Sequence, residues 1–298
     1  MDPNILARFD RLNVWKRGDN RAPHKPLLLL YALGRLARGE PAFVSFKEAE
    51  PILKKLLEQF GPRTKSLHPE LPFWHLRNDQ VWEVPDAETF LRKKGGSSPT
   101  ASELRKRNAF GGFAEDVRCE LAKDPTLIAQ IAERLLQNHF PESLHSDILD
   151  EVGLTLESRW ESTKRKRDPK FREAVLTAYR RRCAVCRLDI RLGQITIGLD
   201  AAHIRWHQTD GPDEVSNGIA LCAFHHKAFD YGCFMIRSDG TIAISELLTG
   251  NDGLEEMLDR FHGKKIDLPV HPDHHPTRDH LEWHKKEVFK GDSRYIEG

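Results

Sequence analysis

Two short pairs of metal-binding side chains, separated by a long insert, constrain this chain more than any other feature of its sequence. Cys183 and Cys186 form the first pair, and Cys222 and His225 form the second. Thiolates and an imidazole arranged in two such pairs are the usual tetrahedral ligand set of a structural zinc ion. The spacing therefore predicts that a structural Zn²⁺ ion holds the fold together over roughly residues 181–234. The neighbouring His226 is the alternative to His225 as the fourth ligand.

Several polar residues in and after the insert are not needed to hold a zinc ion. His203 lies on an expected strand, and because an imidazole accepts a proton near neutral pH it is a candidate general base. His226 and Asp230 are one helical turn apart, so both can point at one cation. Asp200 could complete that site from the facing strand. These side chains could therefore hold a second divalent cation, either Mg²⁺, Mn²⁺ or another divalent transition metal, and such an ion could take part in catalysis.

The same stretch resembles the HNH nuclease family. The resemblance rests on Cys-x-x-Cys, LDAAHI, SNGIAL and LCAFHH, which occur in this order within residues 169–235. The core of that family is a two-stranded hairpin leading into a helix, and His203, Asn217 and His226 match the three positions of its name. The resemblance implies that Asn217 holds the loop that orients the catalytic histidine. Without the motif, His203 would be interpreted as a core histidine and Asn217 as part of a turn.

One position departs from the family pattern. Many members carry a metal-binding His or Asp immediately before the first catalytic histidine, whereas this chain has Ala202 there. The resemblance therefore implies that Asp200 or Asp230 replaces the missing ligand.

Length and composition limit the remaining possibilities. A chain of 298 residues is long enough for two domains, each with its own core. The net charge of +1 means that binding to nucleic acid has to come from local basic patches. Five cysteines, three of them in the predicted zinc set, suit a reducing cytoplasm better than a disulfide framework. The N-terminal residues lack the apolar stretch of a signal peptide, and no apolar run is long enough to span a membrane.

The hydrophobic pattern predicts an α+β protein with two domains. A mainly helical domain is expected over 1–150, and the resemblance described next makes it the DNA-recognition domain; a linker is expected over 151–168. The zinc-stapled domain over 169–298 is a ββα-metal nuclease domain by its HNH resemblance. Within the first domain, LPFWHLRNDQVWEVP is expected to form a hairpin, and Gly111 with Gly112 to interrupt a helix that Ser102 caps. The basic residues 164–167 are interpreted either as solvated linker or as an arm that contacts phosphates.

The first half resembles the sulfur-binding domain of McrA-like, phosphorothioate-dependent restriction endonucleases. The segments that carry this resemblance are APHKPLLLLYAL, LPFWHL with VWEV, NAFGGF and HFPESLH. Proteins of this family bind double-stranded DNA in which sulfur replaces a non-bridging phosphate oxygen, and then cut nearby. In the family the histidine of the PHK turn lies at the modified phosphate beside a cation. The resemblance implies these roles for His24 and Lys25.

A phosphorothioate keeps its negative charge, but its sulfur is larger, softer and less hydrated than oxygen. Recognition should therefore combine cationic contacts with an apolar dent that sulfur can fill. The cationic contacts would come from Arg17, Arg21, His24 and Lys25. The dent would come from Pro23, or from Pro99 with Ala101. Solvated surface loops are the alternative interpretation of both segments.

The sequence thus predicts a cytoplasmic, modification-dependent endonuclease that cuts phosphorothioated double-stranded DNA and has no membrane contact. One rival is an HNH enzyme directed to another mark such as methylcytosine, which would need stacked aromatic residues around a flipped base; Trp74 and Trp82 are the candidates. A second rival is a non-catalytic, zinc-stabilised DNA-binding protein. Because one HNH site cuts one strand, cutting both would take a homodimer or two successive binding events.

Overall fold

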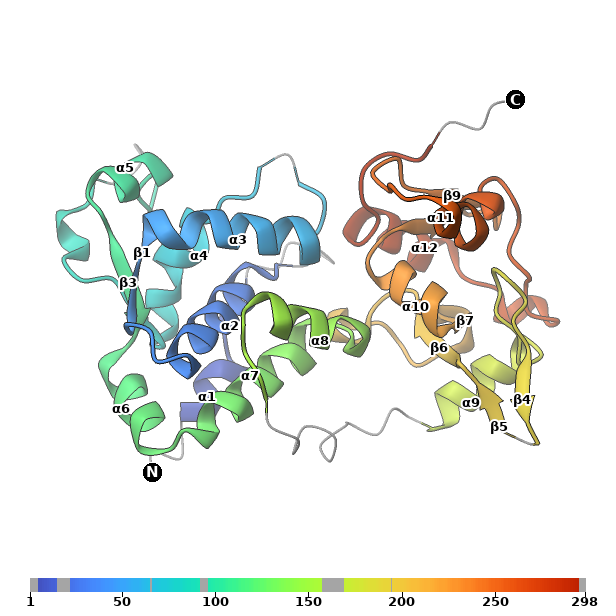
Figure 1. Ribbon diagram of the computed structural model, residues 1–298, viewed down its shortest axis with the longest axis horizontal. Coiled ribbons are helices and arrows are strands. Elements are labelled where there is room, and N and C mark those ends of the chain that lie inside the picture. The colour runs from blue at the N-terminus through green and yellow to red at the C-terminus, as the bar shows by residue number, and fades with distance from the viewer. Residues whose placement is uncertain are drawn as a thin grey trace. The chain divides into compact units, whose positions relative to one another are not determined.

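The computed structural model describes residues 5–14, 22–64, 66–91, 96–156, 169–193 and 195–294. The chain divides into two compact units, Met1–Glu161 and Ser162–Gly298 (Figure 1). Arg17, Arg21 and the basic residues 164–167 lie outside the described residues. The predicted mixture of helices and strands is confirmed in both units.

The first unit is mainly helical and is built around one buried helix. Its described helices are α1 (Ile5–Asp10), α2 (His24–Ala37), α3 (Phe46–Phe60), α4 (Glu70–His75), α5 (Ala101–Lys106), α6 (Glu115–Lys123), α7 (Thr126–His139) and α8 (Glu142–Glu151). The leucine run of α2 has no exposed surface, and the helix packs against α3, α4 and α7. Its apolar surface on all sides is typical of a central helix. Val152 and Leu154 beyond α8 are also buried in this unit.

A small antiparallel sheet completes the first unit and corrects two predictions. Its strands are β1 (Phe43–Ser45), β2 (Trp82–Glu83) and β3 (Phe110–Phe113), in the order β1-β3-β2. Gly111 and Gly112 do not interrupt a helix but form the central strand. A side chain at Gly111 would place its Cβ 2.8 Å from the rings of Phe73 and Trp82, so the ring packing there requires glycine. The helix that follows Ser98 is capped by Thr100, not by Ser102.

The predicted hairpin over LPFWHLRNDQVWEVP is also wrong. This segment forms α4, a 3₁₀ turn over Leu76–Asp79 and strand β2, and β2 pairs with the distant β3. Phe73, Trp74 and Leu76 are all buried, so the apolar residues do not alternate between a core face and a solvent face. Burial in several directions suits a short helix wedged between α2 and α3 better than a strand.

The second unit combines helices with three two-stranded hairpins. Its described elements are α9 (Pro169–Ala178), β4 (Ile190–Leu192), β5 (Ile195–Ile197), β6 (Leu199–His203), β7 (Gly218–Cys222), α10 (Ala223–Asp230), β8 (Phe234–Ile236), β9 (Ile242–Ile244), α11 (Asp252–Met257) and α12 (Arg278–Glu287). The predicted hairpin around Asp239 and Gly240 and the predicted C-terminal helix are both confirmed. Helix α12 packs against α10, where the His284 ring stacks on Phe229 at a centroid distance of 3.7 Å.

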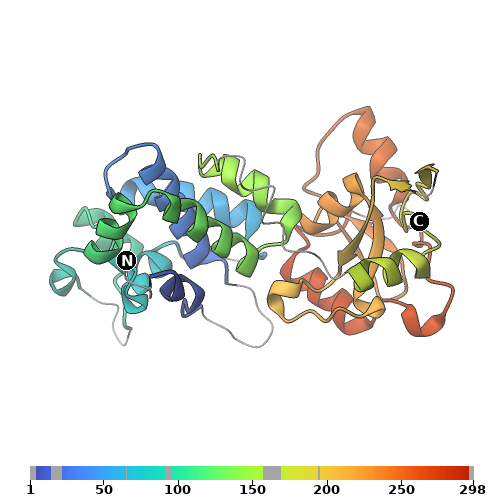
Figure 2. The ribbon, with the colours of Figure 1, turned by 90° about the horizontal axis from the view of Figure 1, so that it is seen from below.

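The β6–β7 hairpin is the centre of this unit. His203 pairs with Gly218 at one end, and Leu199 pairs with Cys222 at the other. Helix α9 packs across the hairpin, as Figure 2 shows, and α10 continues directly from β7. A Cβ at Gly218 would lie 2.3 Å from Val175, so glycine is what allows α9 to approach. Both helices therefore hold the hairpin that carries the candidate catalytic residues. Within the described part of the chain, no helix is long and apolar enough to cross a membrane.

Candidate active site and DNA-recognition surface

The four predicted zinc ligands meet in one group. Ligand atoms of Cys183, Cys186, Cys222 and His225 all lie within 4.8 Å of one another, and no other such group of three or more occurs among the described residues. The loop after α9 supplies the first two cysteines, while the end of β7 and the first turn of α10 supply Cys222 and His225. The neighbouring His226 does not belong to this group.

Two distances in the group fit a tetrahedral zinc ion, and a third, 3.0 Å between Cys222 Sγ and His225 Nδ1, is shorter than such an ion would set. With Zn–S bonds of ~2.3 Å, two cysteine sulfurs should be roughly 3.8 Å apart. The Sγ atoms of Cys186 and Cys222 are 3.9 Å apart, and Cys183 Sγ lies 3.7 Å from His225 Nδ1. His225 Nε2 donates a hydrogen bond of 2.8 Å to the carbonyl of Met257, which directs Nδ1 toward the sulfurs. The donor set and its orientation therefore suit a structural metal.

The sulfur atoms also influence each other's ionisation. Hydrogen bonds from Cys183 and Cys222 lower the pKa of Cys186 to about 3. The same close contacts raise the pKa of Cys222, because a second thiolate beside the first is unfavourable. None of the five cysteines forms a disulfide. A divalent cation would relieve the repulsion between neighbouring thiolates.

His203 lies at the end of β6, in a setting that keeps its ring fixed. The ring stacks on Phe171 of α9 at a centroid distance of 4.1 Å, and its Nε2 is 2.7 Å from Oδ1 of Asp213. Burial lowers the pKa of His203, and the hydrogen bond and charge of Asp213 oppose that shift. A donor hydrogen bond from Nε2 to Asp213 selects the tautomer whose Nδ1 carries the lone pair.

Asn217 is buried and ties the loop after His203 to the hairpin. Its Oδ1 accepts a hydrogen bond of 2.9 Å from the backbone N–H of Arg205. Its Nδ2 donates to the carbonyls of Arg205 and Pro212, at 3.0 and 2.9 Å. Each end of the amide is thereby satisfied within the loop that carries Asp213. Such bonds can hold both His203 and its carboxylate partner in position.

His226 lies between the two carboxylates that were considered as cation ligands. Its Nε2 is 3.3 Å from Oδ2 of Asp230, and its Nδ1 is 3.9 Å from Oδ2 of Asp200. The carboxylates thus face different nitrogens of the ring, and one nitrogen cannot serve both. Asp230 is buried and accepts a hydrogen bond of 3.1 Å from the indole of Trp206. Asp200 is more open, and its Oδ1 is 3.2 Å from Arg172.

The predicted DNA-binding residues of the first unit are found at the start of α2. Pro23 is buried before the helix, and His24 is partly buried. Burial lowers the pKa of His24, which has a hydrogen bond to the backbone of Leu67 and lies near His68. The ammonium of Lys25 pairs with Asp79 and contacts the carbonyl of Asn13 at 2.6 Å, and its side chain is only 12% exposed. The charge of Lys25 is therefore already compensated inside this unit.

The second proposed wall of the sulfur dent is formed by residues 99–101, at the start of α5. Pro99 is buried and Ala101 begins α5, which packs against α3. The preceding loop is held by a hydrogen bond of 3.1 Å from the indole of Trp74 to the carbonyl of Ser97. Trp74 and Trp82 are 4% and 2% exposed, so neither presents a ring face on which a flipped base could stack.

Some residues of these sites were not expected from the sequence. They are Phe171, Arg172, Trp206 and Asp213 around the hairpin, and His68, His75 and Asp79 around the start of α2. His75 belongs with the second group because the charges of Lys25 and Asp79 affect its pKa, which burial lowers. No local pattern distinguishes Asp213 from the nearby Asp210 in the sequence.

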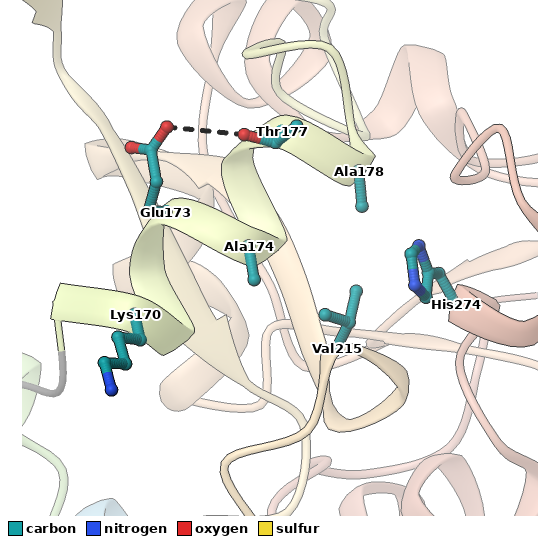
Figure 3. A pocket seen from close by; sticks show the side chains of 7 residues that line it. All are labelled: Lys170, Glu173, Ala174, Thr177, Ala178, Val215 and His274. Carbon is teal, nitrogen blue, oxygen red and sulfur yellow. Dashed lines mark hydrogen bonds between the residues drawn. The ribbon is translucent and has the colours of Figure 1, made fainter.

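A hollow of about 670 Å³ also opens beside α9, but it contains none of the residues discussed above. Figure 3 shows Ala174 and Ala178 of the helix facing it, with Val215 and His274 on the other side. Lys170, Glu173 and Thr177 also line it, but the surface exposed to the hollow is mostly apolar. The predicted catalytic residues lie instead on the β6–β7 hairpin and α10.

Comparisons with known proteins match both halves of the chain. A family model described as "ScoMcrA-like, DNA sulfur-binding domain" matches residues 2–157, and one described as "HNH endonuclease" matches residues 183–237. Both resemblances noted in the sequence are thereby confirmed. A search of curated proteins found no match.

Two similar solved structures each cover 50% of the chain. The "Sulfur binding domain of ScoMcrA complexed with phosphorothioated DNA" is 26% identical over 50% of this chain and 95% of that chain, with a TM-score of 0.45. The "Type IV phosphorothioation-dependent restriction endonuclease ScoMcrA" is 26% identical over 50% of this chain, with a TM-score of 0.43. This chain covers 27% of that longer protein. The chain belongs to the family with the ScoMcrA-like DNA sulfur-binding domain, which it joins to an HNH endonuclease domain.

Proposed function

We propose that this protein binds phosphorothioated double-stranded DNA with its first unit and hydrolyses a nearby phosphodiester bond with its second. The observation that carries the proposal is the presence of a DNA sulfur-binding domain and an HNH endonuclease domain in one chain. The proposed division is a recognition domain over 1–150, a linker over 151–168 and a nuclease domain over 169–298. Because Val152 and Leu154 are buried in the first unit, the beginning of this linker packs on the recognition domain. The proposed location is the cytoplasm, where reducing conditions keep the zinc-binding cysteines as thiols.

In the proposed mechanism, the neutral imidazole of His203 takes a proton from the attacking water. Because burial lowers its pKa, the ring is able to accept a proton at pH 7 and above. The contact of Asp213 with Nε2 leaves the Nδ1 lone pair as the acceptor and stabilises the ring once it is charged. Asn217 keeps the loop that carries Asp213 against the hairpin.

The proposed ligands of the catalytic cation are His226 with Asp230 at its Nε2 or with Asp200 at its Nδ1, since one ring nitrogen cannot serve both carboxylates. Carboxylate oxygens with one imidazole suit Mg²⁺, Mn²⁺ or another divalent transition metal. When bound, such a cation supplies charge neutralisation for the phosphate and for the departing oxygen. The indole of Trp206 fixes the Asp230 carboxylate, and Arg172 balances the charge of Asp200. The zinc proposed for Cys183, Cys186, Cys222 and His225 holds the fold and takes no part in the reaction.

Asp213 provides a test of the general-base assignment. Asp213→Asn should lower kcat about tenfold, because His203 loses the charge that orients and stabilises its protonated ring. Asp213 raises the pKa of His203, so its removal should also shift the acidic limb of the pH–rate profile to lower pH. The measurement is cleavage of a phosphorothioated duplex across a pH series. Asp210→Asn, three residues away, is the matched control. If Asp213→Asn has the pH–rate profile of the wild type, Asp213 does not support His203 as the general base.

For recognition, we propose that the start of α2 contacts the modified phosphate. His24 would lie at the phosphate, with Arg17 and Arg21 as further phosphate contacts and Pro23, or Pro99 with Ala101, lining the apolar dent. Since Asp79 compensates Lys25, that lysine would contribute mainly by holding the beginning of α2 in place.

The expected preference for sulfur is modest and measurable. If the dent buries about 40–60 Å² of poorly hydrated surface at ~25 cal/mol per Å², one phosphorothioate should improve affinity about tenfold. The measurement is a titration of the full-length His203→Ala variant with a modified and an unmodified duplex at several salt concentrations. Both affinities should fall in parallel with salt, since the two duplexes carry the same charge.

A second substitution links the preference to α2. Adding His24→Ala to the His203→Ala variant should reduce its preference for the phosphorothioated duplex over the unmodified one. Adding His271→Ala instead, at an exposed histidine of the second unit, should leave that preference intact. If the His203→Ala variant, whose first unit is unchanged, binds both duplexes equally at every salt concentration, the protein does not recognise phosphorothioates. A duplex carrying methylcytosine in the same titration tests the rival mark.

A further inference from the structure

The two carboxylates beside His226 differ in their surroundings. Both oxygens of Asp230 have a close polar neighbour, since Oδ1 accepts the 3.1 Å hydrogen bond from Trp206 and Oδ2 lies 3.3 Å from Nε2 of His226. The side chain of Asp230 is 2% exposed, whereas that of Asp200 is 32% exposed. A catalytic cation needs open coordination positions for the phosphate and for water. The surroundings of Asp200 leave room for such positions, and those of Asp230 do not.

The indole that holds Asp230 is itself fixed by packing. Trp206 is 1% exposed and packs edge-on against Trp283, with 6.0 Å between the ring centroids. An Nε2–H of His226 can therefore donate to a carboxylate whose other oxygen is already held in place. Metal-binding histidines usually donate their second ring N–H to such a partner, which fixes the tautomer and the orientation of the ring.

The adjacent histidine of α10 has the same arrangement. Nε2 of His225 donates to the carbonyl of Met257, and its Nδ1 faces the cysteine sulfurs. In His226, Nε2 faces Asp230 and Nδ1 faces Asp200, with 3.9 Å between Nδ1 and Oδ2. Two atoms bound to one Mg²⁺ at ~2.1 Å can be up to about 4.2 Å apart, so one cation can bridge this distance.

Arg172 of α9 directs the carboxylate of Asp200. Its Nε is 3.2 Å from Oδ1 of Asp200, and its Nη2 donates a hydrogen bond of 2.9 Å to the carbonyl of Leu199. The guanidinium group thus lies on the side of Oδ1, while Oδ2 is the oxygen measured closest to His226.

We propose that Asp230 is a positioning residue for His226 and that the catalytic cation binds between Nδ1 of His226 and Oδ2 of Asp200. This assignment rests on the proposed function and decides between the two carboxylates. Asp200 supplies the ligand that Ala202 cannot, and Asp230 has no ligand role. Phosphate and water oxygens then fill the remaining coordination positions, as is usual for Mg²⁺.

The first test determines which nitrogen of His226 carries the proton when no catalytic cation is added. Ring-nitrogen NMR signals of the full-length protein, recorded at a pH where the ring is neutral, should show a protonated Nε2 and an unprotonated Nδ1. Asp230→Asn should lose this preference, whereas Asp200→Asn should keep it. A wild-type ring protonated on Nδ1 would direct the Nε2 lone pair at Asp230 and would overturn the proposal.

The second test measures the affinity of the full-length protein for Mn²⁺ by the paramagnetic resonance of the free ion. Asp200→Asn should weaken Mn²⁺ binding about 100-fold, because it removes a charged ligand. Asp230→Asn should weaken it only about tenfold, as is usual when a residue that orients a ligand is lost. Asp210→Asn, an exposed aspartate beyond β6, is the matched control and should bind Mn²⁺ as the wild type does.

A loss of Mn²⁺ affinity in Asp200→Asn that is no larger than the loss in Asp230→Asn would overturn the proposal. If Asp230→Asn does not fold, the wild-type tautomer and the Mn²⁺ affinity of Asp200→Asn still decide, since an unchanged affinity there also overturns it. Neither measurement uses DNA. A protein that cuts no phosphorothioated DNA would therefore refute the proposed function without altering the result for the cation ligands.

Discussion

Replacing His203 with alanine should abolish most of the cleavage and leave DNA binding almost unchanged. A positioned general base accelerates a reaction by about 10²- to 10⁴-fold, and His203→Ala should cost a factor in this range. The base acts in the transition state and contributes little to the ground-state complex, so affinity should stay within about twofold of the wild type. Single-turnover cleavage and a binding titration on the same modified duplex measure the two quantities separately.

The neighbouring histidine is the matched control for this experiment. His207 is exposed, its ring centroid is 6.1 Å from that of His203, and its Nδ1 is 3.8 Å from the same Asp213. His207→Ala should retain most of the activity. Substantial cutting by His203→Ala combined with loss of cutting by His207→Ala would move the base to His207. Loss of affinity together with activity in His203→Ala would instead indicate that His203, stacked on Phe171, has a structural role.

The parts of the structure that could be predicted from the sequence are those specified by residues close together in the chain. Cys183 with Cys186, and Cys222 with His225, are each three residues apart, and such spacings define the turns that bring metal ligands together. The buried leucine run of α2 and the amphipathic α3 were recognisable for a similar reason. Their apolar patterns extend over several helical turns.

What could not be predicted depends on contacts between distant residues. Asp213 meets His203 across 10 residues, Trp206 meets Asp230 across 24, and Arg172 meets Asp200 across 28. Lys25 was expected to face DNA, yet it pairs with Asp79 across 54 residues. A charged side chain in a loop has the same local sequence whether it faces solvent, DNA or another side chain. Only the folded chain distinguishes these cases.

Removal of one cysteine from the proposed zinc site should unfold the second unit and spare the first. Structural zinc contributes about 10–16 kcal/mol of apparent binding free energy in small zinc-binding domains, as much as the whole stability of a typical domain. Purified protein should carry about one zinc per chain, and Cys186→Ser should lose both the metal and the amide-exchange protection of β6 and β7. Protection in α2 should persist, because that helix lies in a separate compact unit.

An exposed cysteine of the first unit provides the control for Cys186→Ser. Cys119→Ser changes an exposed cysteine of the first unit and should leave zinc content and exchange protection as in the wild type. The Cys186 thiol sits among Cys183 and Cys222, so its replacement leaves three donors that cannot close a tetrahedron with protein ligands alone. Wild-type protein without zinc that still protects β6 and β7 would show that side-chain packing alone holds the hairpin. The packing of Val175 against Gly218 and of Phe229 against His284 would then have to supply the missing stability.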